Sequence, residues 1–106
     1  MKILVIERSK TIHKLIEDTV EEEGHVFIRC ETALDALHIY KTDTPQLVIM
    51  NIELEDMSGF DLAKALREQD AKISRARHVE QWIPIIFISS NFSDDYIAKG
   101  IAAGAD

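Results

Sequence analysis

The stretch Pro45-Gln46-Leu47-Val48-Ile49-Met50-Asn51 decides how this chain folds. Its four consecutive apolar residues, 47–50, begin after a proline and a polar residue and end at an asparagine. A short apolar run with such boundaries predicts a strand that is covered on both faces, as the strands of a parallel sheet are. Similar runs at residues 3–6 and 85–88, and a mixed segment at residues 25–30, predict three further strands.

Four amphipathic helices are predicted between and after these strands. Apolar residues recur at helical spacing, with charged residues between them, within segments 12–20, 33–40, 62–66 and 97–101. Strands and helices therefore alternate along the 106 residues, a length that allows one domain with one core. This alternation predicts an α/β fold with a parallel sheet, helices on both of its faces and right-handed crossovers.

Composition and charge argue against several classes of protein. The formal net charge of −7 disfavours direct binding to nucleic acid or to an anionic membrane, and it is compatible with a protein partner or a cation. The apolar runs are too short for a membrane span or a signal peptide, so we expect a cytoplasmic protein. Cys30 is the only cysteine, which excludes an internal disulfide, and its surroundings predict a small core or boundary residue.

The residues that follow the predicted strands are candidates for a functional site. In open parallel sheets, ligands bind outside the carboxyl ends of the strands. Glu7 and Arg8 follow the first predicted strand. Asn51 follows the third strand, and Ser89 follows the fourth. We therefore expect these side chains to gather at one edge of the sheet.

Four stretches with a recognisable order and spacing carry a family resemblance. They are Ile3-Leu4-Val5-Ile6-Glu7-Arg8, the stretch 45–51 with Gly59 eight residues after Asn51, Pro84-Ile85-Ile86-Phe87-Ile88-Ser89-Ser90, and Gly104-Ala105-Asp106. Together they resemble receiver domains of the two-component response-regulator family over essentially the whole chain. The resemblance implies a flavodoxin-like fold with the parallel sheet order 2-1-3-4, in which the family's usual fifth strand and helix are absent.

The resemblance also implies a domain boundary. Residues 1–106 would form one receiver-like domain that is truncated at its C-terminus. The absent elements would leave an edge strand and apolar surface without their usual cover. We expect that the natural protein continues beyond Asp106, or that a partner or a swapped element covers this surface.

This chain departs from the family pattern at the phosphorylation site. In the family, a carboxylate after the third strand attacks phosphorus, two acids after the first strand hold Mg²⁺, and a hydroxyl after the fourth strand bonds the phosphoryl group. Here Asn51 occupies the phosphoacceptor position, and a carboxamide is neutral and a very poor nucleophile. The positions of the acidic pair hold Glu7 and Arg8, and a guanidinium repels a cation. Ser89 keeps the switch hydroxyl.

The two departures together predict a pseudo-receiver that is not phosphorylated at Asn51 and has no catalytic residue. We expect no cofactor, because the Mg²⁺ that the resemblance implies would be lost, and residual metal binding would fall to Glu7 and Glu53. Arg8 is predicted to pair with Glu7, and also with Glu53, roughly where Mg²⁺ would lie.

Other interpretations stay open. The chain could be an active receiver that carries an Asp-to-Asn substitution at position 51, or a small flavodoxin-like enzyme or cofactor-binding domain, although it has no Gly-rich phosphate loop. The hydroxyl of Ser89 could simply bond the backbone. The acidic loop over residues 53–56 could bind a cation or be solvated, and the basic segment 71–82 could be a solvated insertion or a docking surface.

The partners that the resemblance implies are proteins. They are a histidine kinase or a phosphotransfer protein, a C-terminal output domain fused to the receiver, and a second copy in a homodimer. No direct contact of this domain with nucleic acid or membrane is expected. The predicted role is therefore that of a non-enzymatic signalling module.

Overall fold

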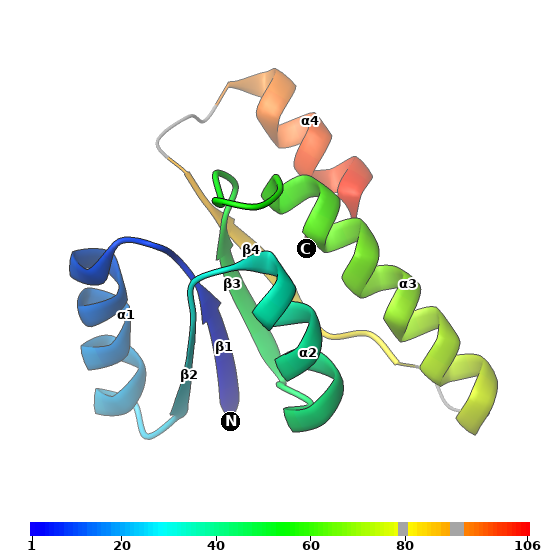
Figure 1. Cartoon of the computed structure of the whole chain (residues 1–106), viewed down its shortest axis with the longest axis horizontal. Helices are drawn as coiled ribbons and strands as arrows, with labels where there is room; N and C mark the ends of the chain where they lie inside the picture. The colour runs from blue at the N-terminus through cyan, green and yellow to red at the C-terminus, as the bar shows by residue number, and fades with distance from the viewer. Residues whose placement is uncertain (79–80, 90–92) are drawn as a thin grey trace.

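Strands and helices alternate in the computed structural model, which describes residues 1–78, 81–89 and 93–106. In chain order, the elements are β1 (Lys2–Ile6), α1 (Lys10–Glu22), β2 (Val26–Cys30), α2 (Ala33–Asp43), β3 (Leu47–Asn51), α3 (Gly59–Arg77), β4 (Ile85–Ile88) and α4 (Asp94–Ala103). All strand pairs are parallel, and the sheet order is β2-β1-β3-β4 (Figure 1). The predicted α/β fold and strand order are therefore confirmed.

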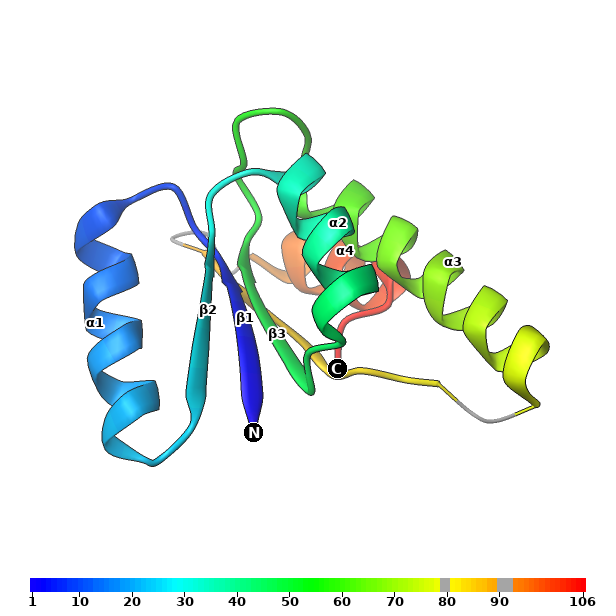
Figure 2. The same cartoon turned by 60° about the horizontal axis from the view of Figure 1, so that its bottom comes forward.

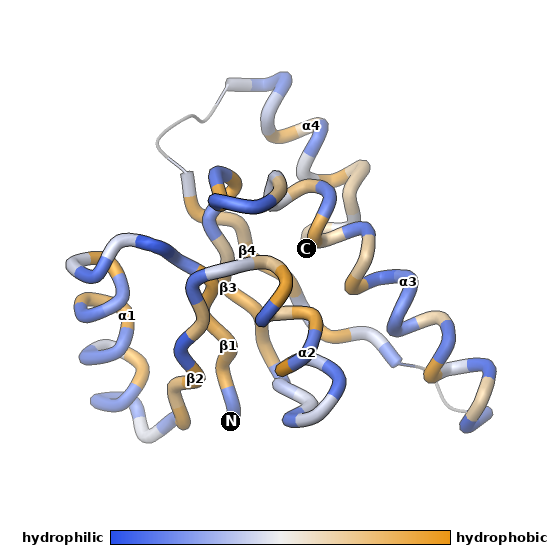
Figure 3. The backbone as a smooth tube through the Cα atoms, in the orientation of Figure 1, coloured by the Kyte–Doolittle hydropathy of each residue, from blue (hydrophilic) through white to orange (hydrophobic). Residues whose placement is uncertain are grey.

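The helices cover both faces of the sheet, with α1 on one face and α2, α3 and α4 on the other (Figures 1 and 2). Successive side chains of a strand point to opposite faces. Accordingly, Leu4 and Ile6 belong to the large core cluster with residues of α2 and α3, whereas Ile3 and Val5 pack in a smaller cluster with Val20 of α1. Figure 3 shows the apolar strands at the centre, between helices whose turns alternate in hydropathy.

The basic segment 71–82 starts as a helix. α3 is 19 residues long and ends where His78 adopts the left-handed conformation, with φ of 54°. Residues 79–80 lie outside the described part of the chain, and residues 81–84 lead into β4. The buried residues of α3 end at Asp70, so its last turns project beyond the core (Figure 2).

A single arginine joins α3 to the segments before β4 and after α4. The guanidinium of Arg67 lies 3.4 Å from the ring centroid of Trp82. It also donates to the carboxylates of Asp70 and Asp106, at 2.9 and 2.8 Å. The buried Asp70 accepts a second hydrogen bond, of 2.6 Å, from the hydroxyl of Tyr40 on α2. Because a buried carboxylate needs such partners, this network fixes α3 against α2 and β4.

Exposed apolar side chains of the described residues include two groups near β4 and α4, besides Met1, Val26, Leu34 and Trp82. Ile12 and Leu15 of α1 are exposed on one face of the sheet together with Ile86 of β4. Ile97 and Ile101 are exposed on α4. These residues are exposed apolar surface, while the predicted loss of its usual cover and the segment or partner that would supply a cover stay predictions. In the described part of the chain, no helix combines the length and the apolar character needed to span a membrane.

Two leucines on helices test where the core lies. Leu66 on α3 is 0% exposed, whereas Leu34 on α2 is 71% exposed. Leu66→Ala should lower the free energy of unfolding by about 2–5 kcal/mol, because it removes a buried side chain and leaves a cavity. Leu34→Ala should change it by less than about 0.5 kcal/mol. Urea denaturation of both variants measures the difference, and equal losses would contradict the assignment of the core.

Candidate functional site

The sheet brings four of the predicted site residues, Glu7, Asn51, Glu53 and Ser89, to one edge. β1 pairs with β3 so that Ile6 faces Met50, and β3 pairs with β4 so that Asn51 faces Ile88. Parallel strands end at the same edge, so the residues at and after these positions meet there. They line a surface cavity of about 540 Å³, whose walls are Glu7, Ile12, Leu15, Ile16, Asn51, Glu53, Ile88 and Ser89.

The carboxylate of Glu7 is the centre of this site. Glu7 is 1% exposed. Its Oε2 accepts a 2.7 Å hydrogen bond from Nδ2 of Asn51, and its Oε1 accepts the backbone N–H of Ser9 at 3.0 Å. Both oxygens of the buried carboxylate therefore receive donors that belong to the chain itself, which offsets the cost of its burial.

The backbone fixes which way the amide of Asn51 points. The N–H of Glu53 donates to Oδ1 of Asn51 at 2.8 Å. Because a backbone N–H can only donate, the atom that it faces must be the amide oxygen, which turns the NH₂ group toward Glu7. An aspartate in the same place would put two acceptor-only, like-charged groups at hydrogen-bond distance. Asparagine therefore fits this site without a cation between the two side chains.

The predicted ion pair between Arg8 and Glu7 does not form. Arg8 is exposed, and within the described residues its guanidinium has no ion pair with Glu7 or with Glu53. The physical reason is that both carboxylate oxygens of Glu7 already accept hydrogen bonds from Asn51 and Ser9, while the side chain of Arg8 lies in solvent. The side-chain donor that Glu7 binds is the amide of Asn51 instead.

Metal binding at this edge stays a prediction. Glu7 is buried, but the side chain of Glu53 is exposed and only its backbone N–H bonds Asn51. Across residues 1–78, 81–89 and 93–106, no group of three or more His, Cys, Asp or Glu side chains could hold a metal ion. Ser89 lies at the cavity and is half-buried, whereas Ser90 lies outside the described residues.

The loop after β3 packs tightly against the strand end. The N–H of Gly59 donates to the carbonyl of Ile52 at 2.6 Å. A Cβ at position 59 would lie 2.6 Å from the backbone oxygen of Asn51. Only glycine therefore allows α3 to begin this close to Asn51, which explains the Gly59 of the sequence pattern.

Asp56 has a structural role that the sequence did not reveal. Its two carboxylate oxygens accept the backbone N–H groups of Ala33 and Leu34, both at 3.0 Å. These donors belong to the first turn of α2, where the helix dipole also favours negative charge. The hydrogen bond from Ala33, followed by that from Leu34, lowers the pKa of Asp56 below its usual range. Asp56 is therefore a cap for α2 rather than a free acid of a cation-binding loop.

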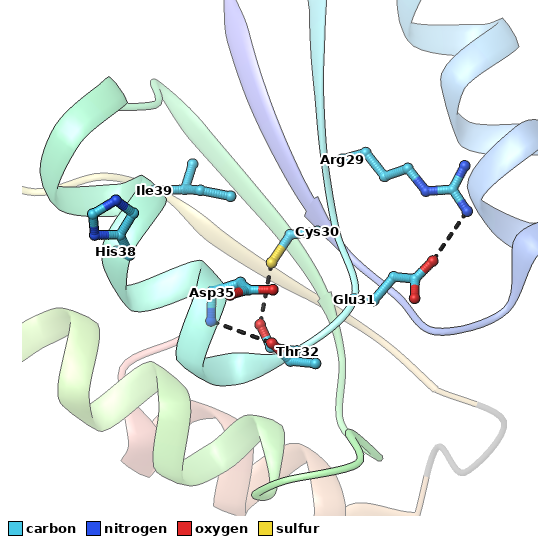
Figure 4. A pocket seen from close by; sticks show the side chains of 7 residues that line it. All are labelled: Arg29, Cys30, Glu31, Thr32, Asp35, His38 and Ile39. Carbon is cyan, nitrogen blue, oxygen red and sulfur yellow. Dashed lines mark hydrogen bonds and ion pairs between the residues drawn. The ribbon is translucent and has the colours of Figure 1, made fainter.

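A second cavity, of about 520 Å³, lies between the end of β2 and the start of α2 (Figure 4). Its only thiol, that of Cys30, points to the carbonyl of Thr32 at 3.1 Å. Burial raises the pKa of Cys30 to about 11, so the thiol stays protonated at neutral pH and is a poor nucleophile. Cys30 belongs to the core, which confirms the predicted core position. The ion pair between Arg29 and Glu31 lies away from this thiol (Figure 4).

The sheet order β2-β1-β3-β4, with the candidate residues at the carboxyl edge, is that of the flavodoxin-like fold. The family model described as the response regulator receiver domain matches residues 3–106. The chain therefore belongs to the response regulator receiver family. Domains of this family are generally non-enzymatic signalling modules.

The chain is similar in sequence to response regulators of Brucella species. The polar-differentiation response regulator DivK of Brucella anthropi is 30% identical over 88 residues, which are 83% of this chain and 65% of that protein. DivK of Brucella ovis is 28% identical, again over 83% of this chain and 65% of that protein. The chain thus spans somewhat less than two thirds of the length of these curated relatives.

Solved structures agree with the family. The receiver domain of the Francisella response regulator 1452 is 25% identical, with a TM-score of 0.83 over 99% of this chain and 78% of that one. The chemotaxis response regulator CheY4 of Vibrio cholerae is 22% identical, with a TM-score of 0.84 over 98% of this chain and 80% of that chain. The similarity to CheY4 supports the assignment of the fold alone.

The hydrogen bond between Asn51 and Glu7 can be tested by an exchange of amide for acid. Asn51→Asp should lower the free energy of unfolding at pH 7 by about 1–3 kcal/mol, because it replaces a donor to a buried carboxylate by a like charge. Like charge raises the folded-state pKa of one carboxyl of the pair above its unfolded value, so stability falls as pH rises. The loss should therefore be smaller at pH 5 than at pH 7 in urea denaturation.

Gln46→Glu is the matched control for this exchange, since Gln46 is exposed and uses only its amide oxygen, as acceptor for the N–H of Lys2. It should change the free energy of unfolding by less than about 0.5 kcal/mol. If Asn51→Asp were as stable as the control at pH 7, the amide would not be required by Glu7.

Asp56→Ala tests the cap of α2. The variant should lose about 1 kcal/mol of stability at neutral pH, because two N–H groups of the first turn lose their acceptor. The contribution of a carboxyl with a lowered pKa is present above the unfolded pKa and is lost as pH falls through the folded one. The difference between variant and wild type, measured by thermal denaturation, should therefore disappear in acid. Glu55→Ala, which removes the exposed neighbouring acid, should have little effect at either pH.

Proposed function

We propose that this domain is a pseudo-receiver, which is not phosphorylated at Asn51 and acts through protein contacts. The observation that carries the proposal is the 2.7 Å hydrogen bond from Nδ2 of Asn51 to Oε2 of Glu7. In an active receiver, a carboxylate stands in place of this amide and must be free to attack phosphorus. Here the amide is a neutral donor that is engaged by the residue which would otherwise hold the metal.

The residues at this edge do not fit Mg²⁺. The ion prefers oxygen ligands in octahedral geometry and keeps several waters. Glu7 is the one buried acid of the site, and its oxygens accept from Asn51 and Ser9. Arg8 stands at the second acidic position of the family pattern, and its guanidinium cannot serve as a ligand for a cation. No step of the proposed function therefore passes through a metal ion.

The proposed output is a contact with another protein. Candidate partners are a histidine kinase or a phosphotransfer protein, a C-terminal output domain fused to the receiver, and a second copy of the chain. The net charge of −7 supports a protein partner over nucleic acid or an anionic membrane. We place the domain in the cytoplasm and assign it no enzymatic activity.

Small phosphodonors provide the test of this proposal. Incubation of the wild-type chain with acetyl phosphate and Mg²⁺, followed by intact mass measurement, should give no phosphate adduct. The double variant Asn51→Asp, Arg8→Asp, which restores the acids of the family pattern, should gain one phosphate that maps to the peptide with position 51. Circular dichroism checks that the double variant is folded.

Three outcomes would contradict the proposal in different ways. A stoichiometric adduct on the wild-type peptide that contains Asn51 would show that the domain accepts phosphate in its present form. An adduct on Asn51→Asp with Arg8 intact, as abundant as on the double variant, would favour an active receiver that has lost only its nucleophile. A bound cofactor in the purified protein would favour a flavodoxin-like enzyme or cofactor-binding domain.

A further inference from the structure

Two helix ends of opposite charge lie at the edge of the sheet away from Asn51. α1 ends with three consecutive glutamates, residues 21–23, and α3 ends with Lys72, Arg75 and Arg77 among its last residues. All of these side chains are exposed. Both helices run against the direction of the strands, so both ends lie at the amino edge of the sheet, on opposite flanks (Figures 1 and 2). We call them the acidic end of α1 and the basic end of α3.

The acidic end of α1 is unfavourable in a single copy. The carboxyl end of a helix carries partial negative charge and favours cations. The last turn of α1 has no basic residue. Lys14 lies farther back and pairs with Glu17 and Asp18, and within the described residues the glutamates at 21–23 have no ion pair. A cation from another molecule would offset this repulsion.

The basic end of α3 is positioned to supply that cation. The buried residues of α3 end at Asp70, so the last seven residues of the helix extend past the core (Figure 2). In the described part of the chain, Lys72, Arg75 and Arg77 form no ion pair. They are exposed cations on a chain whose net charge is −7.

An exposed tryptophan lies beside the basic end. Trp82 is 54% exposed, yet its ring is held by the stacked guanidinium of Arg67 and by a 2.9 Å hydrogen bond from Nε1 to Asp106. The N–H of Gln81 donates to Oγ of Ser74 at 2.8 Å, which places this segment against the last turns of α3. A large aromatic side chain held in one position is the type of residue that dominates protein interfaces.

We propose that the chain forms a symmetric dimer, in which the basic end of α3 of each copy binds the acidic end of α1 of the other. The two ends lie on opposite flanks of one edge. Rotation by 180° about an axis perpendicular to the view of Figure 1, placed beyond that edge, exchanges the two flanks, so that the acidic end of each copy lies on the same flank as the basic end of the other. Both contacts form at once, and the assembly closes at two copies.

This proposal deepens the proposed output through protein contacts, in which a second copy is one candidate partner, but it does not depend on whether Asn51 is phosphorylated. The contacts lie at the amino edge of the sheet, whereas Asn51 and Glu7 lie at the carboxyl edge. A second copy is favoured as the occupant because the chain itself carries both complementary charges. Nucleic acid could bind only the basic end and would be repelled by the rest of the chain.

Complementary charge reversals test the dimer. One variant, Glu21→Lys with Glu22→Lys, makes both ends basic, and the other, Arg75→Glu with Arg77→Glu, makes both ends acidic. Sedimentation equilibrium at low ionic strength should show that wild type associates and that each variant alone has a dissociation constant at least about tenfold larger. An equimolar mixture of the two variants should recover the wild-type association, because each contact again joins opposite charges.

The fluorescence of Trp82 gives an independent measurement, since it is the only tryptophan of the chain. Its emission should shift to shorter wavelength when the wild type, or the mixture of variants, associates, and high salt should reverse the shift. The control Lys10→Glu with Lys64→Glu changes the net charge as Arg75→Glu with Arg77→Glu does, at two exposed lysines in the first turns of α1 and α3, away from the amino edge. It should associate like wild type.

Three results would overturn the dimer. They are a wild-type chain that stays monomeric at low ionic strength, a control that loses association as fully as the variants at the helix ends, and a variant mixture that does not associate. Association only with added DNA would indicate that the basic end binds nucleic acid instead. Circular dichroism of each variant shows whether a loss of association reflects a loss of folding.

Discussion

The buried carboxylate of Glu7 needs hydrogen-bond donors, and the way in which the chain supplies them organises the carboxyl edge of the sheet. Ser9 donates its backbone N–H to one oxygen while its own hydroxyl caps α1, so this bond joins the end of β1 to the start of a helix. Asn51 donates its amide to the other oxygen and joins β1 to β3. A carboxylate at position 51 would require a cation or a proton between the two groups, whereas the amide requires neither.

The same asparagine directs the loop that follows β3. Its amide oxygen accepts the N–H of Glu53, and its backbone oxygen lies where a side chain at position 59 would need space. Between these points the loop carries Asp56 to the first turn of α2. One short segment thus fixes the start of two helices. At this edge, donors and acceptors of the chain itself satisfy the carboxylate of Glu7 and the amide of Asn51, which is consistent with the proposed output through contacts elsewhere on the surface.

Much of the fold could be predicted from the sequence because the signals are local. Apolar runs of four residues mark strands buried on both faces, and helical spacing marks the segments between them. The strand order followed from the family resemblance. The predicted pair between Arg8 and Glu7 was wrong, since nearness in sequence does not make neighbouring side chains meet. The role of Asp56 was missed, because its partners at positions 33 and 34 lie more than twenty residues away and no local pattern marks such a contact.

The sequence by itself determined the alternation of strands and helices, the family, and the absence of a carboxylate at position 51. Each of these depends on residue type and spacing along the chain. Only the tertiary structure decided what Asn51 does there, because the donor at Nδ2 and the acceptor on Glu7 are separated by 44 residues and meet through the register of β1 and β3. It likewise decided that the basic end of α3 projects from the core beside Trp82, since the stacking of Arg67 on that ring joins segments that the sequence separates.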